Sequence, residues 1–287
     1  MSQEVTQPSN REAAQPPSRQ PNHVLTLRTT PPPLLGRAAR LVERNALANR
    51  RAWMIFVSGL FEPVFYLFAM GVGVAALVGE VPGPDGQPVS YGVFVAPALL
   101  AVSAMNGGTY ESTFNVFAKL KWGRVYDAVL ATPLTPRDVA VGELTWALVR
   151  GSVYAVGFLL VATVAGLVTS PWAVLALPAA TLIGFAFAGM GLAATSYMRS
   201  WQDFDLVQLV LLPMLLFSAT FYPLEVYPEG VRWVVWLSPL YHGVEVVRAA
   251  MLGVWSWLLP VHVAVLAGLG SAGLRVAIAR FDATLRT

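Results

Sequence analysis

Cysteine is absent from this chain of 287 residues. Neither a disulfide framework nor a thiolate metal site can therefore form. Charged residues make up only 12% of the sequence, whereas an average soluble domain carries about 25%. The formal net charge is +3, which is too small to indicate nucleic-acid binding. These shortages exclude cysteine-based stabilisation and argue against a nucleic-acid partner.

The phosphate-binding loop of many ATPases is also missing. That loop, G-x-x-x-x-G-K-[ST], needs a lysine followed by serine or threonine. The two lysines, Lys119 and Lys121, are followed by Leu120 and Trp122. The chain therefore cannot hydrolyse ATP by that route. If transport here is driven by ATP, the ATPase must be a separate polypeptide.

Other catalytic and metal-binding patterns are equally hard to find. His23, His242 and His262 are scattered, with no partner at metal-ligand spacing. Ser103 and Ser112 have no nearby histidine and aspartate that would complete a catalytic triad. We therefore expect no metal site and no catalytic residues in this chain.

Apolar residues dominate what is present. The hydrophobic share is 56% and the mean hydropathy is +0.59. Several apolar stretches reach the roughly 20 residues needed to cross a hydrocarbon core. The sequence therefore predicts an all-α polytopic membrane protein. Its six expected transmembrane helices cover residues 53–78, 91–114, 139–168, 172–197, 206–221 and 255–278.

Positive charge alternates between the loops that separate these spans. Arginines and lysines precede the first span, separate the second from the third and follow the fourth and sixth. Residues 79–90 and 169–171 carry no positive charge. The positive-inside rule then places both termini on the cytoplasmic side of the membrane. We expect this membrane to be a bacterial plasma membrane. The polar, proline-containing stretch at 124–144 falls on the same side.

The N-terminal part divides into two pieces. Residues 1–33 are rich in Gln, Pro, Ser and Asn, which predicts a disordered cytoplasmic tail. At 34–51, Leu34, Ala38, Leu41 and Val42 share one helical face, and arginines largely occupy the other. This pattern is typical of an amphipathic helix on the inner membrane surface. An arginine-rich stop that only sets orientation is the alternative.

The loop between the fifth and sixth spans is too apolar for a free loop. Residues 222–253 also contain three prolines and several charges, which forbid a clean crossing. Two re-entrant helices on the extracytoplasmic side would explain both properties. The alternative is a seventh span interrupted by prolines. The charged residues that we select in this region are Glu225, Glu245 and Arg248.

Four ionisable residues fall within or next to the expected spans, namely Glu62, Glu111, Glu143 and Arg150. Such residues are functional candidates because a charge in the membrane is costly unless it is paired or hydrated. Glu143 and Arg150 are seven residues apart and so share one face of a helix. One hypothesis is that these two interact within the bundle, and the other is that each fixes packing to another helix.

Small residues recur every four positions in the fourth span. Gly184 is followed by Ala188, and Gly189 by Ala193. This spacing lets two helix backbones approach closely. It is common in polytopic proteins and does not identify a dimer interface.

Four stretches together resemble a known protein family. They are "FEPVFYLFAMGVG", "YESTFNVFAKLKWGRVYDAVLATPLTPRDVAVGELTWALVRG", "SPWAVLALPAA" and "LLPMLLFSATFYPLEVYP…WLSPLYHGVEVVRA". They resemble the permease subunits of type-2 ABC exporters, and most of all the group of the nodulation lipo-oligosaccharide exporter and daunorubicin-type drug exporters. The resemblance extends over nearly the whole chain from about residue 36. It implies that residues 34–287 form a type-2 ABC transmembrane domain.

The resemblance also implies partners and a mechanism. Two permease copies or paralogues pair, and each binds a separate ABC ATPase that holds the ATP and magnesium. A cytoplasmic coupling helix between spans two and three, at about 116–131, would contact that ATPase. The residues that we expect at this ATPase-coupling interface are Lys119, Arg124, Tyr126, Asp127 and, on the flanking helix, Arg44.

The cargo implied by the resemblance is an amphiphile moved outward, such as a lipo-oligosaccharide, a glycolipid or a hydrophobic drug. Two other functions stay open on the residues alone. The intramembrane charges would suit an ion-coupled secondary transporter, and an integral membrane enzyme acting on lipids is a further alternative.

Overall fold

A bundle of long apolar helices forms the body of the protein. The structure is a computed structural model that describes residues 34–50 and 53–285, so the predicted tail at 1–33 lies outside the described residues. The bundle consists of α2 (Trp53–Phe68), α4 (Tyr91–Tyr110), α6 (Pro136–Val164), α7 (Ala176–Thr195), α8 (Asp203–Leu216) and α11 (Leu259–Leu285). α-Helix therefore dominates the described residues, as the hydropathy pattern predicts.

Two of these helices continue through wider, π-helical turns. α2 runs on through η1 (Ala69–Val74) into α3 (Ala75–Val78). α4 runs on through η2 (Glu111–Asn115) and η3 (Ala118–Trp122). π-Helical turns inside α-helices are rare and often occur at functional sites. The second continuation carries two charged residues, Glu111 and Lys119.

Four helices in the described part are long and apolar enough to cross a membrane: 91–122, 136–164, 171–195 and 259–283. A shorter apolar helix covers 63–78. The expected fifth span at 206–221 needs correction, because α8 ends at Leu216 and the chain beyond it is not helical. At 1.5 Å per residue, the 14 residues of α8 extend about 21 Å, which is short of a 30 Å core.

α7 is the helix around which the others pack. It contacts α4, α6, α10 (Pro239–Leu252) and α11. A Cβ atom on Gly189 would collide with the backbone of Gly270 on α11, and one on Gly108 of α4 would collide with the backbone of Gly184. The small residues predicted from spacing therefore serve contacts between helices of the same chain.

α6 begins at a well-defined cap. Thr135 and Asp138 form a reciprocal capping box, in which the Asp138 carboxylate accepts from the Thr135 backbone N–H at 2.8 Å. Pro136 occupies the first helical turn, where its missing N–H costs nothing. The Arg37 guanidinium lies 3.7 Å from the buried Asp138 carboxylate. The start of α6 is thus fixed both locally and by a preceding helix.

That preceding helix, α1 (Leu34–Asn49), packs against α6. Ala38, Leu41 and Asn45 are buried at helical spacing, and a Cβ atom on Gly142 would collide with Leu41. The apolar face of α1 is therefore directed, at least over Ala38 and Leu41, toward protein. This corrects the expectation that the whole face would lie against the membrane.

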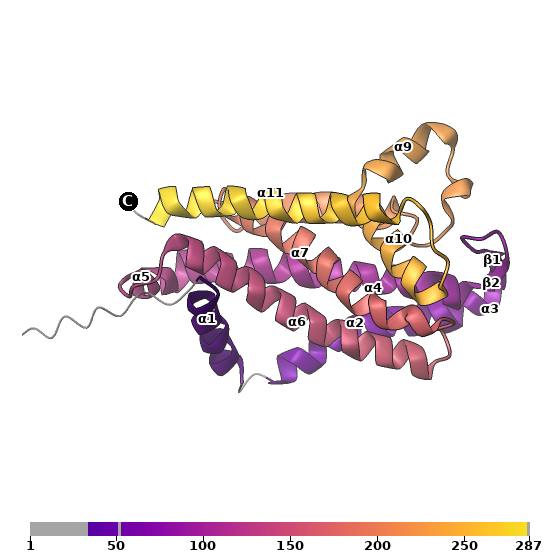
Figure 1. Cartoon of the computed structure of the whole chain (residues 1–287), viewed down its shortest axis with the longest axis horizontal. Coiled ribbons are helices and arrows are strands. Elements are labelled where there is room, and N and C mark those ends of the chain that lie inside the picture. The colour runs from indigo at the N-terminus through magenta and orange to yellow at the C-terminus, as the bar shows by residue number, and fades with distance from the viewer. Residues whose placement is uncertain (1–33, 51–52, 286–287) are drawn as a thin grey trace, which may run out of the picture. The chain divides into compact units, whose positions relative to one another are not determined.

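The shorter elements lie at the two ends of the bundle. α1, α5 (Val125–Leu130) and the end of α11 lie at one end, and α9 (Glu229–Leu237) lies at the other with a small hairpin (Figure 1). The hairpin pairs β1 (Glu80–Pro82) antiparallel with β2 (Pro88–Ser90), in the loop that carries no positive charge.

The segment between α8 and α11 contains short helices. η5 (Leu224–Val226) is a single 3₁₀ turn, and α9 and α10 follow. Neither α9, with 9 residues, nor α10, with 14, reaches the length of a span. The alternative of a seventh span therefore finds no helix of sufficient length here. α10 packs between α4, α7, α11 and the 3₁₀ turn η4 (Pro171–Leu175).

Candidate functional site

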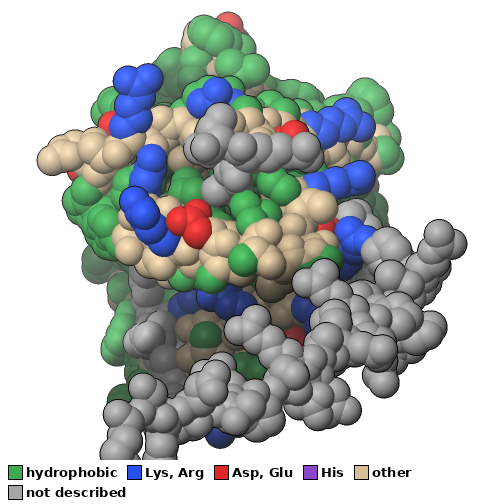
Figure 2. All heavy atoms as spheres, turned by 90° about the vertical axis from the view of Figure 1, so that its left-hand side faces the viewer, with side chains coloured by type: hydrophobic (Ala, Val, Ile, Leu, Met, Phe, Trp, Pro, Cys, Tyr) green, Lys and Arg blue, Asp and Glu red, His purple; other side chains and the backbone are tan. Residues whose placement is uncertain are grey.

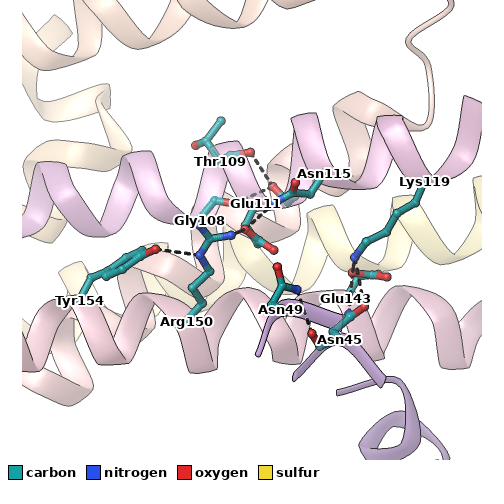
Figure 3. A network of polar contacts seen from close by, with 11 residues as sticks. Asn45, Asn49, Gly108, Thr109, Glu111, Asn115, Lys119, Glu143, Arg150 and Tyr154 are labelled. Atoms are coloured by element: carbon teal, nitrogen blue, oxygen red, sulfur yellow. Dashed lines mark hydrogen bonds and ion pairs between the residues drawn. The ribbon is translucent and has the colours of Figure 1, made fainter. Parts of the chain in front are cut away.

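Two ion pairs join α6 to the continuation of α4. Lys119 Nζ lies 2.6 Å from Glu143 Oε2, and Arg150 Nη1 lies 2.6 Å from Glu111 Oε2. Figure 3 shows both pairs side by side, with Glu111 and Lys119 on one helix and Glu143 and Arg150 on the other. The hypothesis that Glu143 and Arg150 interact with each other is therefore wrong. Each pairs instead with a residue on the facing helix, as the second hypothesis predicts.

The π-helical turns explain how Glu111 and Lys119 face the same helix. Eight residues separate them, and in a regular α-helix this would place their side chains about 80° apart around the axis. η2 and η3 contain these two residues. A π-helical turn holds more residues than an α-helical one, so each residue rotates less. The wider turns thereby reduce the offset.

The first cluster also includes α1. Asn45 Nδ2 donates to Glu143 Oε2 at 3.1 Å, and Lys119 Nζ donates to Asn45 Oδ1 at 3.3 Å. Glu143 is buried, with its side chain only 2% exposed. The carboxylate therefore ties together three helical segments, α1, η3 and α6. Asn45 could not be selected from the sequence, because an uncharged amide on an arginine-rich helix does not indicate contact with a buried ion pair.

The second cluster is surrounded by polar groups from its own helices. Asn115 Nδ2 donates to Glu111 Oε2 at 2.6 Å, and Arg150 Nε donates to the Tyr154 hydroxyl at 2.9 Å. The side chains of Arg150 and Glu111 are 16% and 7% exposed. A charge that is removed from water requires such pairing to be tolerated. Asn115 and Tyr154 stabilise the pair by satisfying further donors and acceptors.

This second cluster forms part of the wall of a cavity of about 410 Å³. The remaining wall is mostly aromatic and aliphatic, with a few uncharged polar groups. Its lining residues come from α2, α4, α6, the end of α8 and the segment beyond it, and include Pro63, Tyr66, Ser103, Asn106, Tyr110, Phe114, Leu215 and Phe221. A pocket of this kind, apolar with a few fixed polar groups, is typical of a small-molecule site.

The predicted coupling segment contains the short helix α5. Arg124, which precedes it, has a left-handed backbone with φ of 42°. Tyr126 is buried and its ring lies 6.5 Å from that of Phe281 on α11. Burial, and then the negative charge of Glu143, raise the pKa of Tyr126 well above its usual value. Tyr126 therefore packs inside the protein and is not available as a surface contact.

The other predicted coupling residues differ in their surroundings. Lys119 is held by Glu143, so its charge already has a partner. Arg124 and Asp127 are exposed on the coupling segment. Arg44 lines a second pocket, of about 450 Å³, between α1 and α5. Of the five expected residues, Arg124 and Asp127 are therefore the two that an approaching protein could reach most directly.

The three charges selected in the segment before α11 are only partly brought together. Arg248 Nη1 lies 2.7 Å from Glu245 Oε1, and its Nη2 donates to the backbone carbonyl of Ala219 at 2.9 Å. Ala219 has a left-handed backbone, with φ of 52°. Glu225 is exposed, and its side chain takes no part in this group. The fourth intramembrane candidate, Glu62, lies in α2, but its side chain is outside the described part.

Two histidines that looked scattered in sequence meet in the structure. His242 on α10 and His262 on α11 are both buried, with their Nδ1 atoms 2.6 Å apart. The rings of Trp236 and Tyr241 surround them at centroid distances of 5.7 to 5.8 Å. One histidine must donate and the other accept. The pair is brought together by the reversal between α10 and α11, which spacing along the chain does not reveal.

Comparison with known proteins gives one consistent family. The family described as ABC-2 type transporter matches residues 38–252. Nodulation protein J of Rhizobium leguminosarum bv. viciae is 36% identical over 214 residues, which cover 73% of this chain and 80% of that protein. Nodulation protein J of Rhizobium meliloti is 34% identical over 212 residues, with coverages of 73% and 79%. The protein of the same name from Bradyrhizobium diazoefficiens is 31% identical over 211 residues, with the same coverages.

Proposed function

This chain belongs to the ABC-2 type transporter family, and on that premise we propose that its 410 Å³ cavity receives an amphiphilic molecule on its way out of the cell. The family makes it the membrane subunit of an ABC exporter. Its multi-pass location in the plasma membrane follows from the family together with the long apolar helices.

The composition of the cavity wall is the observation that carries the choice of cargo. Glu111 and Arg150 present charge, whereas Tyr66, Phe114 and Phe221 present aromatic surface. A molecule with a polar head and an apolar tail would find a partner for each part. A lipo-oligosaccharide, a glycolipid and a hydrophobic drug all satisfy this description, and resemblance to proteins named for nodulation favours the first.

The position of α5 and α6 supports a route for the driving force. Our proposal is that a separate ABC ATPase contacts the coupling segment through Arg124 and Asp127. The capping box at Thr135 and Asp138 begins α6 only a few residues later. α6 then carries both Glu143 and Arg150. Movement at the coupling segment would thus reach the cavity wall through one continuous helix.

The remaining parts of the proposal follow the family and the charge pattern. A second permease copy or paralogue would complete the pathway, and ATP and magnesium would be bound by the ATPase. The end with α1 and α5 would face the cytoplasm together with both termini. Lysine and arginine side chains are spread over that end, with fewer acidic ones (Figure 2).

The structure supports the hypothesis of an ion-coupled transporter less than the sequence does. Its motivation was a set of intramembrane charges, and Glu111, Glu143 and Arg150 each have a partner of opposite charge. An ion-coupling site would instead need a carboxylate that is free to bind and release its ion. A lipid-modifying enzyme is likewise not favoured by any cluster among the residues described here.

A cavity-filling variant tests the proposal. A Cβ atom on Gly107, which lines the cavity, would meet nothing within 4 Å, so Gly107→Trp should enter empty space. We expect the complex with its ATPase to assemble but to lose stimulation of ATP hydrolysis by amphiphiles. Gly73→Trp is the matched control, because Gly73 also faces open space but does not line the cavity. Normal export by the Gly107 variant would show that the cavity is not the route.

A further inference from the structure

The pocket between α1 and α5 concentrates positive charge without a balancing carboxylate. Its lining includes three arginines, Arg40, Arg44 and Arg124, and no aspartate or glutamate. Glu43 accepts from Arg40 at 3.1 Å, but it lies on the exposed surface of α1 outside the pocket lining. Three guanidinium groups around one hollow repel one another unless an anion lies between them.

One of these arginines is positioned unusually. Arg44 Nη1 is fully buried and has no hydrogen-bond partner among the described residues. A buried donor without an acceptor is destabilising, and such groups are rare in folded proteins. The guanidinium of arginine is suited to planar, bidentate recognition of phosphate and carboxylate oxygens. A bound oxyanion would therefore satisfy this donor and balance the charge at once.

The opposite wall of the pocket comes from one face of α5. Val125, Ala128 and Val129 of α5 line it at the spacing of a single helical face, together with Thr132 just beyond the helix. Tyr126 points instead into the protein core, and Asp127 is exposed outside the pocket lining. Asp127, which we assign to the ATPase contact, thus lies outside the face that closes the pocket, whereas Arg124 borders both.

Apolar residues beside the pocket indicate where its ligand comes from. Trp122, next to the pocket residue Gly123, is 66% exposed, and Leu47, three residues beyond Arg44 on α1, is 57% exposed. Tryptophan favours the depth of the lipid headgroups in a membrane. An anion that arrives with an acyl chain would therefore be favoured over a free one.

We propose that the Arg40–Arg44–Arg124 pocket binds the phosphate of an anionic phospholipid from the cytoplasmic leaflet. The headgroup would bridge α1 and the segment leading into α5, two elements that lie far apart in the sequence. Bound lipid would thereby hold α1 beside the coupling segment. This site is separate from the cargo cavity, and it does not depend on the nature of the cargo.

The test is a thermal-stability titration of the purified full chain with defined lipids. Phosphatidylglycerol should raise the unfolding midpoint in a concentration-dependent manner, because a ligand that binds only the folded state stabilises it. Phosphatidylcholine, which has no net charge, should raise it far less. A titration with inorganic phosphate tests whether an anion without an acyl chain is enough to stabilise the protein. Equal stabilisation by phosphatidylglycerol and phosphatidylcholine would overturn the proposal, and so would inorganic phosphate acting as strongly as the lipid.

Variants assign the effect to the pocket. Arg44→Gln and Arg124→Gln should each weaken the apparent affinity for phosphatidylglycerol by roughly tenfold, since each loses a charge-assisted contact. Arg137→Gln removes an exposed arginine that does not line the pocket, and it should bind the lipid like the wild type. Arg124 is exposed, so its variant is expected to fold even if the Arg44 variant does not.

Arg44→Gln also distinguishes the lipid from the ATPase, because Arg124 is itself a proposed ATPase contact. If Arg44→Gln leaves the lipid titration unchanged but loses the co-purifying ATPase, the pocket is a partner contact and the lipid proposal is wrong. If the lipid affinity falls while the ATPase still co-purifies, the proposal stands. Failure of the cavity test with Gly107→Trp would leave this result unaffected.

Discussion

Arg150 Nη1 lies 2.6 Å from Glu111 Oε2, and this contact joins α6 to η2 in the wall of the 410 Å³ cavity. The pair is almost closed off from solvent, yet it borders the cavity that we propose for the cargo. A buried ion pair of this kind contributes little net stability, but it becomes costly when one member is lost. Its position suggests a role in shaping the cavity.

The first prediction concerns this pair. Glu111→Gln or Arg150→Gln alone should lower the free energy of unfolding by about 3–5 kcal/mol, because the remaining charge is left buried without its partner. The double variant should lose less than the sum of the two. Thermal unfolding in detergent measures this, with Tyr154→Phe as a control that removes the hydrogen bond from Arg150 Nε but leaves both charges in place. Additive losses would contradict the geometry.

The second prediction separates true partners from neighbours on one helix. A double-mutant cycle between Lys119 and Glu143 should give a coupling energy of about 0.5–3 kcal/mol. A cycle between Glu143 and Arg150 should give a value near zero, since about 10 Å of α6 separates them. The same unfolding assay serves for both cycles. A large coupling in the second cycle would restore the pairing that the structure replaces.

The third prediction tests the contact with the ATPase. Asp127→Arg reverses the charge of an exposed residue on α5 and should uncouple ATP hydrolysis from transport without affecting membrane insertion. Arg137→Glu, also exposed but within α6, is the control for a simple change of surface charge. Tyr126→Ala is a poor probe, because removal of a fully buried aromatic ring costs about 3–5 kcal/mol. If Asp127→Arg transports normally, α5 does not contact the motor at this point.

The fourth prediction is a dependence on pH. Backbone N–H groups of Arg199, and then of Ser200, donate to the Asp203 carboxylate and lower its pKa. A carboxylate with a lowered pKa in the folded state stabilises the fold above its unfolded pKa, and this contribution is lost as the pH falls through the folded value. Asp203→Asn should therefore show a smaller loss of thermal midpoint between neutral pH and pH values below 4. A titration identical to that of the wild type would show that Asp203 is not responsible.

The fifth prediction concerns the contact between α7 and α11. A Cβ atom on Gly270 would collide with the ring and backbone of Phe185, whereas one on Gly268 would meet nothing within 4 Å. Gly270→Ala should therefore destabilise the protein. Gly268→Ala, in the same helix, should be neutral or stabilise it by up to about 1 kcal/mol through helix propensity. The difference between the two thermal midpoints is the measurement, and equal midpoints would mean that the helices do not approach here.

Sequence could predict the helices better than their pairing. Apolar length predicts α4, α6, α7 and α11, and the sequence around Thr135 carries the signals of a helix start. The partners of Glu143 and Arg150 could not be predicted, because they depend on how far α4 rotates in its π-helical continuation. The end of α8 at Leu216 could not be predicted either, because apolar residues continue beyond the point where the helix stops.

The cavity and the pocket lined by Arg40, Arg44 and Arg124 could not be predicted from the sequence either. Each is lined by segments that lie far apart in the chain, such as α1 and α5 around Arg44 and Arg124. The meeting of His242 and His262 depends on the angle between α10 and α11. Residue spacing describes one helix at a time, so contacts between helices need the packed structure.

The order of charges on the two facing helices limits how they can move. Along the continuation of α4 the order is negative at Glu111 and positive at Lys119, and α6 presents positive Arg150 and negative Glu143 opposite them. Sliding α6 by two turns would bring like charges together, Glu143 against Glu111 or Arg150 against Lys119. The ion pairs therefore oppose translation of α6 along the continuation of α4 in either direction, whereas a tilt or rotation of both helices together would leave the pairs intact.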